Sequence, residues 1–202
     1  TATTDIYSIT DGVVSAGSAC ANDVVISAGV WSIEHHAFSA AQQITRVTFA
    51  DDGLLTDIGE YAFEWTTSLA TIEIPASVTT ISRAAFFGTT DLASMFFLGN
   101  DPAIDGDIFF TSQYPDKVLE APTKAYFRDG ASGFTSVDGK WNGVPISPFY
   151  TLTFDATGSL SGSAPSQITS GGGENVTMPG NSGGLTKAGY TFAGWNSEPG
   201  GT

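Results

Sequence analysis

The stretch Ile74-Pro75-Ala76-Ser77-Val78-Thr79-Thr80-Ile81 decides the fold, because its pattern recurs on both sides of it along the chain. An Ala-Phe pair follows the stretch at Ala85-Phe86, and related pairs lie before and after it. The Phe of these pairs recurs at spacings of 25, 23 and 23 residues, and an Ile stands five residues before each one. The matching positions are Ile33 with Phe38, Ile58 with Phe63, Ile81 with Phe86, and Ile104 with Phe109. This repeat is the strongest signal in the sequence.

Each repeat also holds a short alternating apolar segment, seen in Val47 and Phe49 and again in Ile72 and Ile74. Such alternation predicts a strand with two side chains pointing inward and one pointing outward. A single unit of this length is unable to bury its own apolar residues, whereas stacked units bury them against their equivalents in the next coil. The repeat therefore predicts a solenoid, in which the small Ala allows close approach of the coils and the Phe fills the space between them.

The quoted stretch, with Ala85-Phe86 and Leu92 after it, resembles the BspA-like (Treponema-type) leucine-rich repeat over residues 20–146. The other copies depart mildly from the pattern, since Ser27 stands where Pro75 does and Ile108 replaces the Ala in the last pair. The resemblance implies a right-handed solenoid on bacterial surface proteins, which often serve adhesion.

Both ends of a solenoid need caps. At the start, residues 1–19 are expected to form a capping hairpin that turns at Asp11-Gly12. At the other end Val118 keeps the repeat spacing, but Glu120 falls on an apolar position, so the last coil breaks up there. The sequence that follows resembles the usual close of these arrays, with Tyr126 on a short helix and Trp141 packed into the cap.

Residues 150–202 differ in character, being rich in Gly and aromatic residues. Alternation over 150–154, around 176–178 and over 189–195 predicts a packed β unit. These segments resemble the Listeria–Bacteroides repeat, a small β-grasp-like module that occurs in tandem on bacterial surface proteins. That family normally continues past the final Gly-Gly-Thr with another strand, so a truncated module is expected. The predicted fold class is mainly β with short helical or irregular segments, a solenoid followed by this module.

The charge and composition of the chain limit the classes of binding partner and of metal site that we expect. The chain has a formal net charge of −14 with only 7 Lys and Arg, which disfavours nucleic acid and anionic membrane surfaces. Cys20 is the only cysteine, so neither an internal disulfide nor a cysteine metal site is expected. No apolar run approaches the roughly 18–20 residues of a membrane span, so no membrane insertion is expected within this chain. The start at Thr1, without a signal peptide, suggests a mature protein or an excised part of one.

The sequence contains few motifs that indicate catalysis or the binding of a metal or cofactor. His35-His36 is not part of an HExxH motif, and Asp51-Asp52 with Asp57 lacks the spacing of an EF-hand loop. There is no Gly-x-Ser-x-Gly elbow and no phosphate-binding or dinucleotide fingerprint. We therefore predict that the chain is not an enzyme and has no metal or cofactor.

Binding is the more plausible role, through the outward side of the repeat strands, where solenoids usually bind. The outward positions are expected at Val25, Thr48, Glu73, Phe96 and Leu119, flanked by Arg46, Thr71, Ser94 and Leu98. The candidate binding residues are Arg46, Thr48, Thr71, Glu73, Ser94, Phe96 and Leu98. The alternative for Phe96 and Leu98 is packing under the C-terminal cap.

The predicted function is non-enzymatic. We expect a bacterial cell-surface or secreted protein that binds an extracellular protein or glycan in adhesion. The alternative is a structural spacer, or an accessory module, that displays another domain of a larger surface protein. The sequence does not decide the oligomeric state.

Overall fold

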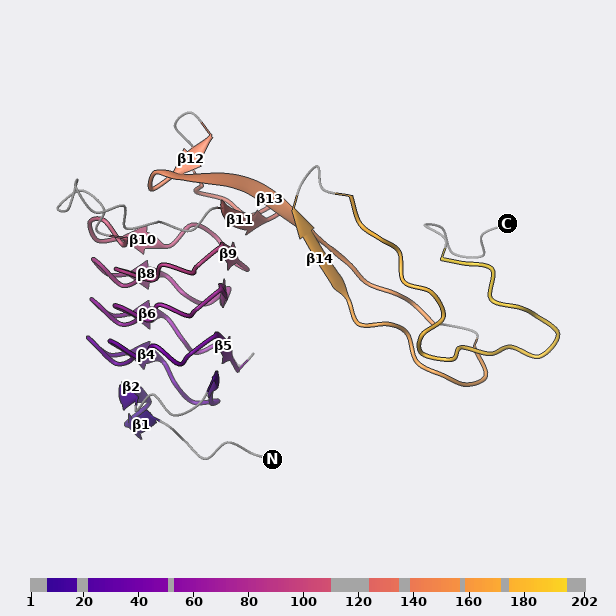
Figure 1. Cartoon of the computed structure of the whole chain (residues 1–202), viewed down its shortest axis with the longest axis horizontal. Helices are drawn as coiled ribbons and strands as arrows, with labels where there is room; N and C mark the ends of the chain where they lie inside the picture. Colours follow the sequence, from indigo (N-terminus) through magenta and orange to yellow (C-terminus); the bar gives the residue numbers. More distant parts are fainter. Residues whose placement is uncertain are drawn as a thin grey trace. The chain divides into compact units, whose positions relative to one another are not determined.

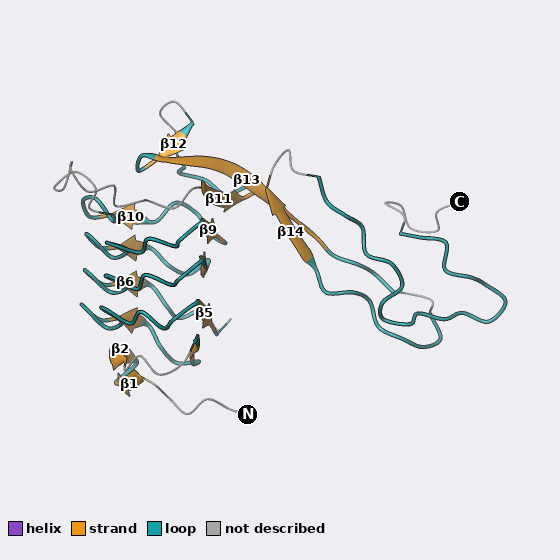
Figure 2. Ribbon diagram, viewed as in Figure 1, coloured by secondary structure: helices purple, strands orange, loops and turns teal. Residues whose placement is uncertain are grey.

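The computed structural model describes residues 7–17, 22–50, 53–109, 124–134, 139–156, 159–171 and 175–195. These residues form strands, turns and loops and contain no helix (Figure 2). The chain divides into two compact units, Thr1–Pro148 and Phe149–Thr202. The first is a stack of coils with one large and one small parallel sheet (Figure 1). The predicted mainly β solenoid is confirmed.

The large sheet is built from the alternating segments of the repeat. Its parallel strands are β3 (Asp23–Ile26), β5 (Arg46–Phe49), β7 (Thr71–Ile74), β9 (Ser94–Phe97) and β11 (Lys124–Arg128). Each strand pairs with the equivalent strand of the next coil, so Val24 lies beside Val47 and Ile72 beside Met95. These inward side chains are buried, as the period of two requires.

The small sheet takes two residues from each coil. Its parallel strands are β4 (Ser32–Ile33), β6 (Asp57–Ile58), β8 (Thr80–Ile81) and β10 (Ala103–Ile104). The sequence predicted only a change of chain direction at these isoleucines, because two residues are too few for a period to be read. An antiparallel hairpin, β1 (Tyr7–Thr10) and β2 (Val13–Gly17), joins this sheet through β2 and β4 and turns at Asp11-Gly12.

A column of stacked phenylalanines runs through the core, which also holds the inward Val, Ile, Leu and Met side chains of the coils. The rings of Phe38 and Phe63 lie 5.3 Å apart and those of Phe63 and Phe86 lie 5.4 Å apart, nearly parallel. The backbone amide of Phe63 donates a hydrogen bond to the carbonyl of Ala85 in the next coil at 2.8 Å. All three Phe side chains are fully buried, and so are the alanines before them. The predicted roles of Ala and Phe in coil stacking are confirmed.

The C-terminal end of the solenoid differs from the prediction. Tyr126 lies in strand β11, not on a helix, because residues 124–127 pair in parallel with β9. Ala125 is the register partner of Met95, so this last strand comes 30 residues after β9 and not 23. Tyr126 therefore takes the place expected for Leu119, which lies outside the described residues together with Val118.

Beyond β11 the large sheet continues with two strands that form a hairpin, β12 (Lys140–Trp141) and β13 (Val144–Leu152). Both hairpin turn residues, Asn142 and Gly143, have positive φ. Trp141 is buried against Phe97, with ring centroids 4.7 Å apart. The predicted packing of Trp141 into the cap is confirmed.

The second unit has fewer strands than predicted. Residues Phe149 to Leu152 at the end of β13 pair antiparallel with β14 (Ile168–Gly171). Phe154 lies beyond the end of β13, and no strand forms at 176–178 or at 189–195, so the strand predictions at these three places are wrong. The ring of Trp195 instead lies 4.8 Å from Phe154, and its Nε1–H donates to the carbonyl of Pro179. Ring packing and this side-chain hydrogen bond are found where strand pairing was expected.

Candidate binding surface

The outward side of the large sheet carries the candidate binding residues. Adjacent parallel strands are in register, so equivalent side chains form two rows across the coils. We call these two rows the outward ladder. One row holds Asp23, Arg46, Thr71, Ser94 and Lys124, and the other holds Val25, Thr48, Glu73, Phe96 and Tyr126.

Six of the seven candidate residues lie on the outward ladder, since only Leu98 falls outside it. Leu98 follows the last residue of β9, is half-buried, and donates its backbone N–H to the carbonyl of Ile74 at 3.0 Å. It therefore borders the ladder at the end of the strand.

The C-terminal end of the ladder is aromatic. The rings of Phe96 and Tyr126 stack at 4.7 Å, and the ammonium of Lys124 lies 4.8 Å from the centroid of the Tyr126 ring. Tyr126 is only 7% exposed, whereas Phe96 is half-buried. The sequence predicted Tyr126 on a short helix of the cap and Leu119 at this ladder position, because the prediction followed the 23-residue spacing. The adjacent aromatic residues Tyr126 and Phe127, a residue type enriched in strands, are the sequence signal that could have identified this strand.

The hydroxyl groups of the ladder differ in what they bond. Thr48 Oγ1 donates to the carbonyl of Val24 in the preceding coil at 3.3 Å, so this hydroxyl helps to join two coils. The hydroxyls of Thr71 and Ser94 make no hydrogen bond to any residue that the structure describes. Arg46 and Glu73 are exposed and form no ion pair within the described part of the chain. These four side chains are available to a partner.

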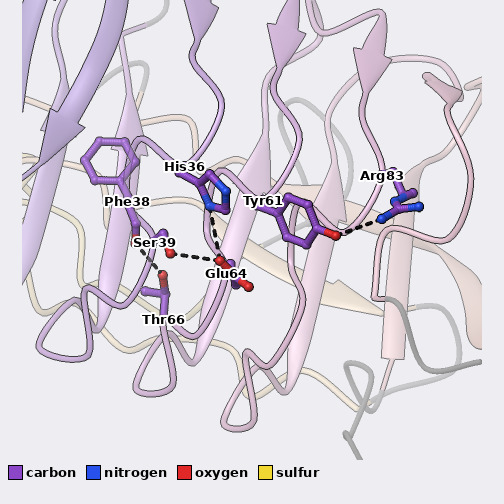
Figure 3. A network of polar contacts seen from close by, with 7 residues as sticks. All are labelled: His36, Phe38, Ser39, Tyr61, Glu64, Thr66 and Arg83. Carbon is purple, nitrogen blue, oxygen red and sulfur yellow. Dashed lines mark hydrogen bonds and ion pairs between the residues drawn. The ribbon is translucent and has the colours of Figure 1, made fainter. Parts of the chain in front are cut away.

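A second polar cluster lies on the turns that follow the small sheet (Figure 3). The rings of His36 and Tyr61 stack at 5.0 Å, and Arg83 donates from Nη2 to the Tyr61 hydroxyl at 2.8 Å. This hydrogen bond is the main reason that the pKa of Arg83 is raised above its ordinary value. Glu60 lies 3.3 Å from Nε of Arg83. The cluster links equivalent turns of three successive coils, so its contacts are cross-coil contacts.

The same cluster brings a serine, a histidine and a carboxylate together. Glu64 Oε2 accepts a hydrogen bond from Ser39 Oγ at 2.9 Å and lies 3.1 Å from Nδ1 of His36 (Figure 3). In a nucleophilic triad the histidine lies between the serine and the carboxylate, so that it takes the serine proton. Here the carboxylate of Glu64 lies between Ser39 and His36. His36 is therefore not placed to take the proton of Ser39, as it would be in a triad.

Metal ligands do not gather in the described part of the chain. No group of three or more His, Cys, Asp or Glu side chains able to hold a metal ion occurs among the described residues. His35 and His36 are neighbours, with ring centroids 4.0 Å apart at 64°. Cys20 and Asp51-Asp52 lie outside the described residues.

Asp101 is a half-buried carboxyl that contacts the C-terminal cap. It occupies the repeat position at which Val78 stands one coil earlier, and its Oδ1 accepts a hydrogen bond from Trp141 Nε1 at 2.8 Å. Burial raises the pKa of Asp101 above its ordinary value, and the hydrogen bond from Trp141 offsets part of this rise. The contact ties the cap to the coil that contains β10.

The stacked coils, the in-register strands and the buried Ile and Phe columns define a leucine-rich-repeat solenoid. Residues 16–122 match the family model for the BspA type leucine rich repeat region in six copies, and the chain belongs to this family. Residues 150–202 match the Listeria-Bacteroides repeat domain. Searches of curated proteins and of solved structures each found no match to the chain.

Both matched families are repeat modules typical of bacterial surface and extracellular proteins, and neither is a family of enzymes. Within the described part of the chain, no helix has the length and apolar character that a bilayer crossing requires.

Proposed function

We propose that the solenoid binds an extracellular protein or glycan through the outward ladder and thereby serves bacterial adhesion. The ladder repeats two outward side-chain positions on successive coils, and such repetition is how solenoids generate an extended binding surface. Both matched modules are typical of the bacterial surface, which is where an adhesin acts.

The observation that carries this proposal is the set of unpaired polar groups on the ladder. Arg46 and Glu73 are exposed, opposite in charge and without an ion pair among the described residues. Glu73 is the register partner of Phe96, whose ring stacks on Tyr126, so this aromatic pair adds apolar area to the same face. A surface with apolar, hydroxyl and charged groups in one plane is suited to specific recognition.

The test is a binding screen of the full chain against extracellular-matrix proteins and a glycan array at physiological salt. Glu73→Gln and Phe96→Ala are expected to weaken a saturable hit by at least about tenfold, in the range of binding hot spots. Glu34→Gln is the matched control, because Glu34 is exposed on a turn after the small sheet, away from the ladder. Melting temperatures of all variants show whether each one is folded.

Unchanged binding by folded Glu73→Gln and Phe96→Ala would place the binding site elsewhere. A screen without any hit would favour the spacer alternative, in which the stacked coils and the second unit display another part of a larger surface protein.

A further inference from the structure

The hairpin turn between β12 and β13 contains the one asparagine of the chain that a glycine follows. Of six asparagines in the sequence, only Asn142 has this neighbour, Gly143. The turn joins the register partners Trp141 and Val144, so it has only two residues. Both have positive φ, of 47° and 80°, as such a turn requires. We propose that Asn142 is a modification site, at which spontaneous deamidation alters the C-terminal cap of the solenoid.

The reaction needs no groups beyond these two residues and water. The backbone nitrogen of Gly143 gives its proton to water and attacks Cγ of Asn142. The bond from Cγ to Nδ2 then breaks, and Nδ2 leaves as ammonia. A five-membered succinimide ring remains, which forms readily because both reacting groups belong to one chain. Water opens this ring at either carbonyl, to give aspartate or isoaspartate, and in isoaspartate the main chain runs through Cβ and Cγ.

Both reacting groups are accessible. Asn142 and Gly143 are exposed. Within the described part of the chain, neither the side-chain amide of Asn142 nor the backbone N–H of Gly143 takes part in a hydrogen bond. A Cβ built on Gly143 would meet nothing within 4 Å, so the attacking nitrogen is not crowded. Strand β12 has only two residues, so the turn opens at low cost when the reacting groups rotate.

Two other asparagines show what makes Asn142 different. Asn181 Nδ2 donates to the carbonyl of Leu185 at 2.8 Å, and its Oδ1 accepts from the N–H of Leu185 at 2.7 Å. These two hydrogen bonds must break before the Asn181 amide can react. Asn175 is exposed, but Val176 follows it, and a β-branched side chain crowds the attacking nitrogen. Asn142 alone combines a free amide with a following glycine.

The turn holds a residue on which the cap depends. Trp141 precedes Asn142, packs on the ring of Phe97 and donates its indole N–H to Asp101. Isoaspartate adds one methylene carbon to the main chain of the turn. Because the length of a hairpin turn fixes the register of its strands, this addition disturbs the pairing of Trp141 with Val144. Isoaspartate is therefore the product that loosens the cap.

The test ages the purified full chain in warm, mildly alkaline buffer and follows each asparagine-containing peptide by mass spectrometry. Deamidation at Asn142 is expected to be at least about tenfold faster than at Asn181, because two hydrogen bonds hold the Asn181 amide. An isoaspartyl methyltransferase assay on the isolated peptide measures how much of the product is isoaspartate. The melting temperature of the fully converted protein is expected to fall by about 2–4 °C.

Asn142→Gly is the variant that removes the reacting amide, and glycine suits the positive φ of the turn. This variant is expected to lose the fast release of ammonia and to keep its melting temperature on ageing. Asn175→Gly is the matched control, since it removes an exposed asparagine that valine follows, and it is expected to age as the wild type does. Melting temperatures of the fresh variants show whether each one is folded.

Two outcomes would overturn the assignment of the site: deamidation at Asn142 no faster than at Asn181, or unchanged fast ammonia release from folded Asn142→Gly. An aged protein that contains isoaspartate at position 142 but melts like the fresh protein would overturn the effect on the cap.

Discussion

The indole Nε1–H of Trp141 donates a hydrogen bond of 2.8 Å to Oδ1 of Asp101, across 40 residues of sequence. Next to it, Asn100 Oδ1 accepts a hydrogen bond from the backbone N–H of Ser132 at 3.0 Å. The N–H of Asp101 donates in turn to the carbonyl of Ser132. These contacts join the last described coil to the cap, where the apolar repeat position is replaced by a carboxylate.

We predict that Asp101→Asn stabilises the protein at neutral pH. Burial raises the pKa of Asp101 above its ordinary value of 3.8, so the folded state holds the proton more tightly than the unfolded state. The protonated carboxyl therefore favours folding at a pH below its pKa in the unfolded state. This contribution to stability is lost as the pH rises through its pKa in the folded state. Asparagine keeps an oxygen for Trp141 and carries no charge. Denaturant unfolding is expected to give a larger gain over the wild type at pH 7 than at pH 3.

Asp91→Asn is the control for that comparison, because Asp91 is an exposed aspartate of the same solenoid. If Asp101→Asn raised the free energy of unfolding equally at pH 7 and pH 3, the desolvated charge of Asp101 would not be what lowers the stability of the wild type.

Phe63→Ala is expected to lower the free energy of unfolding by about 3–5 kcal/mol. Phe63 is fully buried and packs between Phe38 and Phe86, so its removal leaves a cavity between two coils. Phe63→Leu fills more of that space and is expected to cost less. A loss below about 1 kcal/mol for the alanine variant, measured by denaturant unfolding, would contradict the stacked core.

One repeat position offers a matched pair of substitutions. Ala40 and Gly88 are equivalent, with φ of 59° and 71°. This left-handed region costs a residue with a Cβ about 1–2 kcal/mol, so Ala40→Gly is expected to stabilise by about 0.5–1 kcal/mol after the added flexibility of glycine. Gly88→Ala is expected to destabilise, since its Cβ would lie 2.5 Å from a ring atom of Trp65. Thermal unfolding measures both, and shifts of the same sign would contradict the argument.

Thr66→Val is expected to destabilise the solenoid by about 1 kcal/mol. Thr66 is fully buried, and its Oγ1 donates to the carbonyl of Phe38 at 3.0 Å (Figure 3). Valine has nearly the same shape but no donor, so the loss reports this cross-coil hydrogen bond. Thr66→Ser keeps the hydroxyl and is the comparison variant. Denaturant unfolding in which serine is as harmful as valine would attribute the effect to the methyl group.

The candidate surface was predictable wherever the repeat kept its spacing. Thr48, Glu73 and Phe96 follow directly from the apolar positions on either side of them, because in a strand the residue between two buried ones points outward. Tyr126 was not predictable in this way, since its strand follows β9 after a longer interval that breaks the period. The hydroxyl of Thr48 is hydrogen-bonded, whereas those of Thr71 and Ser94 make no hydrogen bond to a described residue. Residue type alone does not predict this difference.

The sequence alone determined the stacking unit, the inward columns and the outward positions of the regular coils, because a local repeat with apolar residues at fixed places is stable only when stacked. Tertiary structure decided how the array closes, with β11 in register beside β9 and Trp141 hydrogen-bonded to Asp101. It also decided which polar groups of the ladder are left for a partner. These features depend on contacts between segments distant in sequence, and the local periodicity of a repeat carries no information about such contacts.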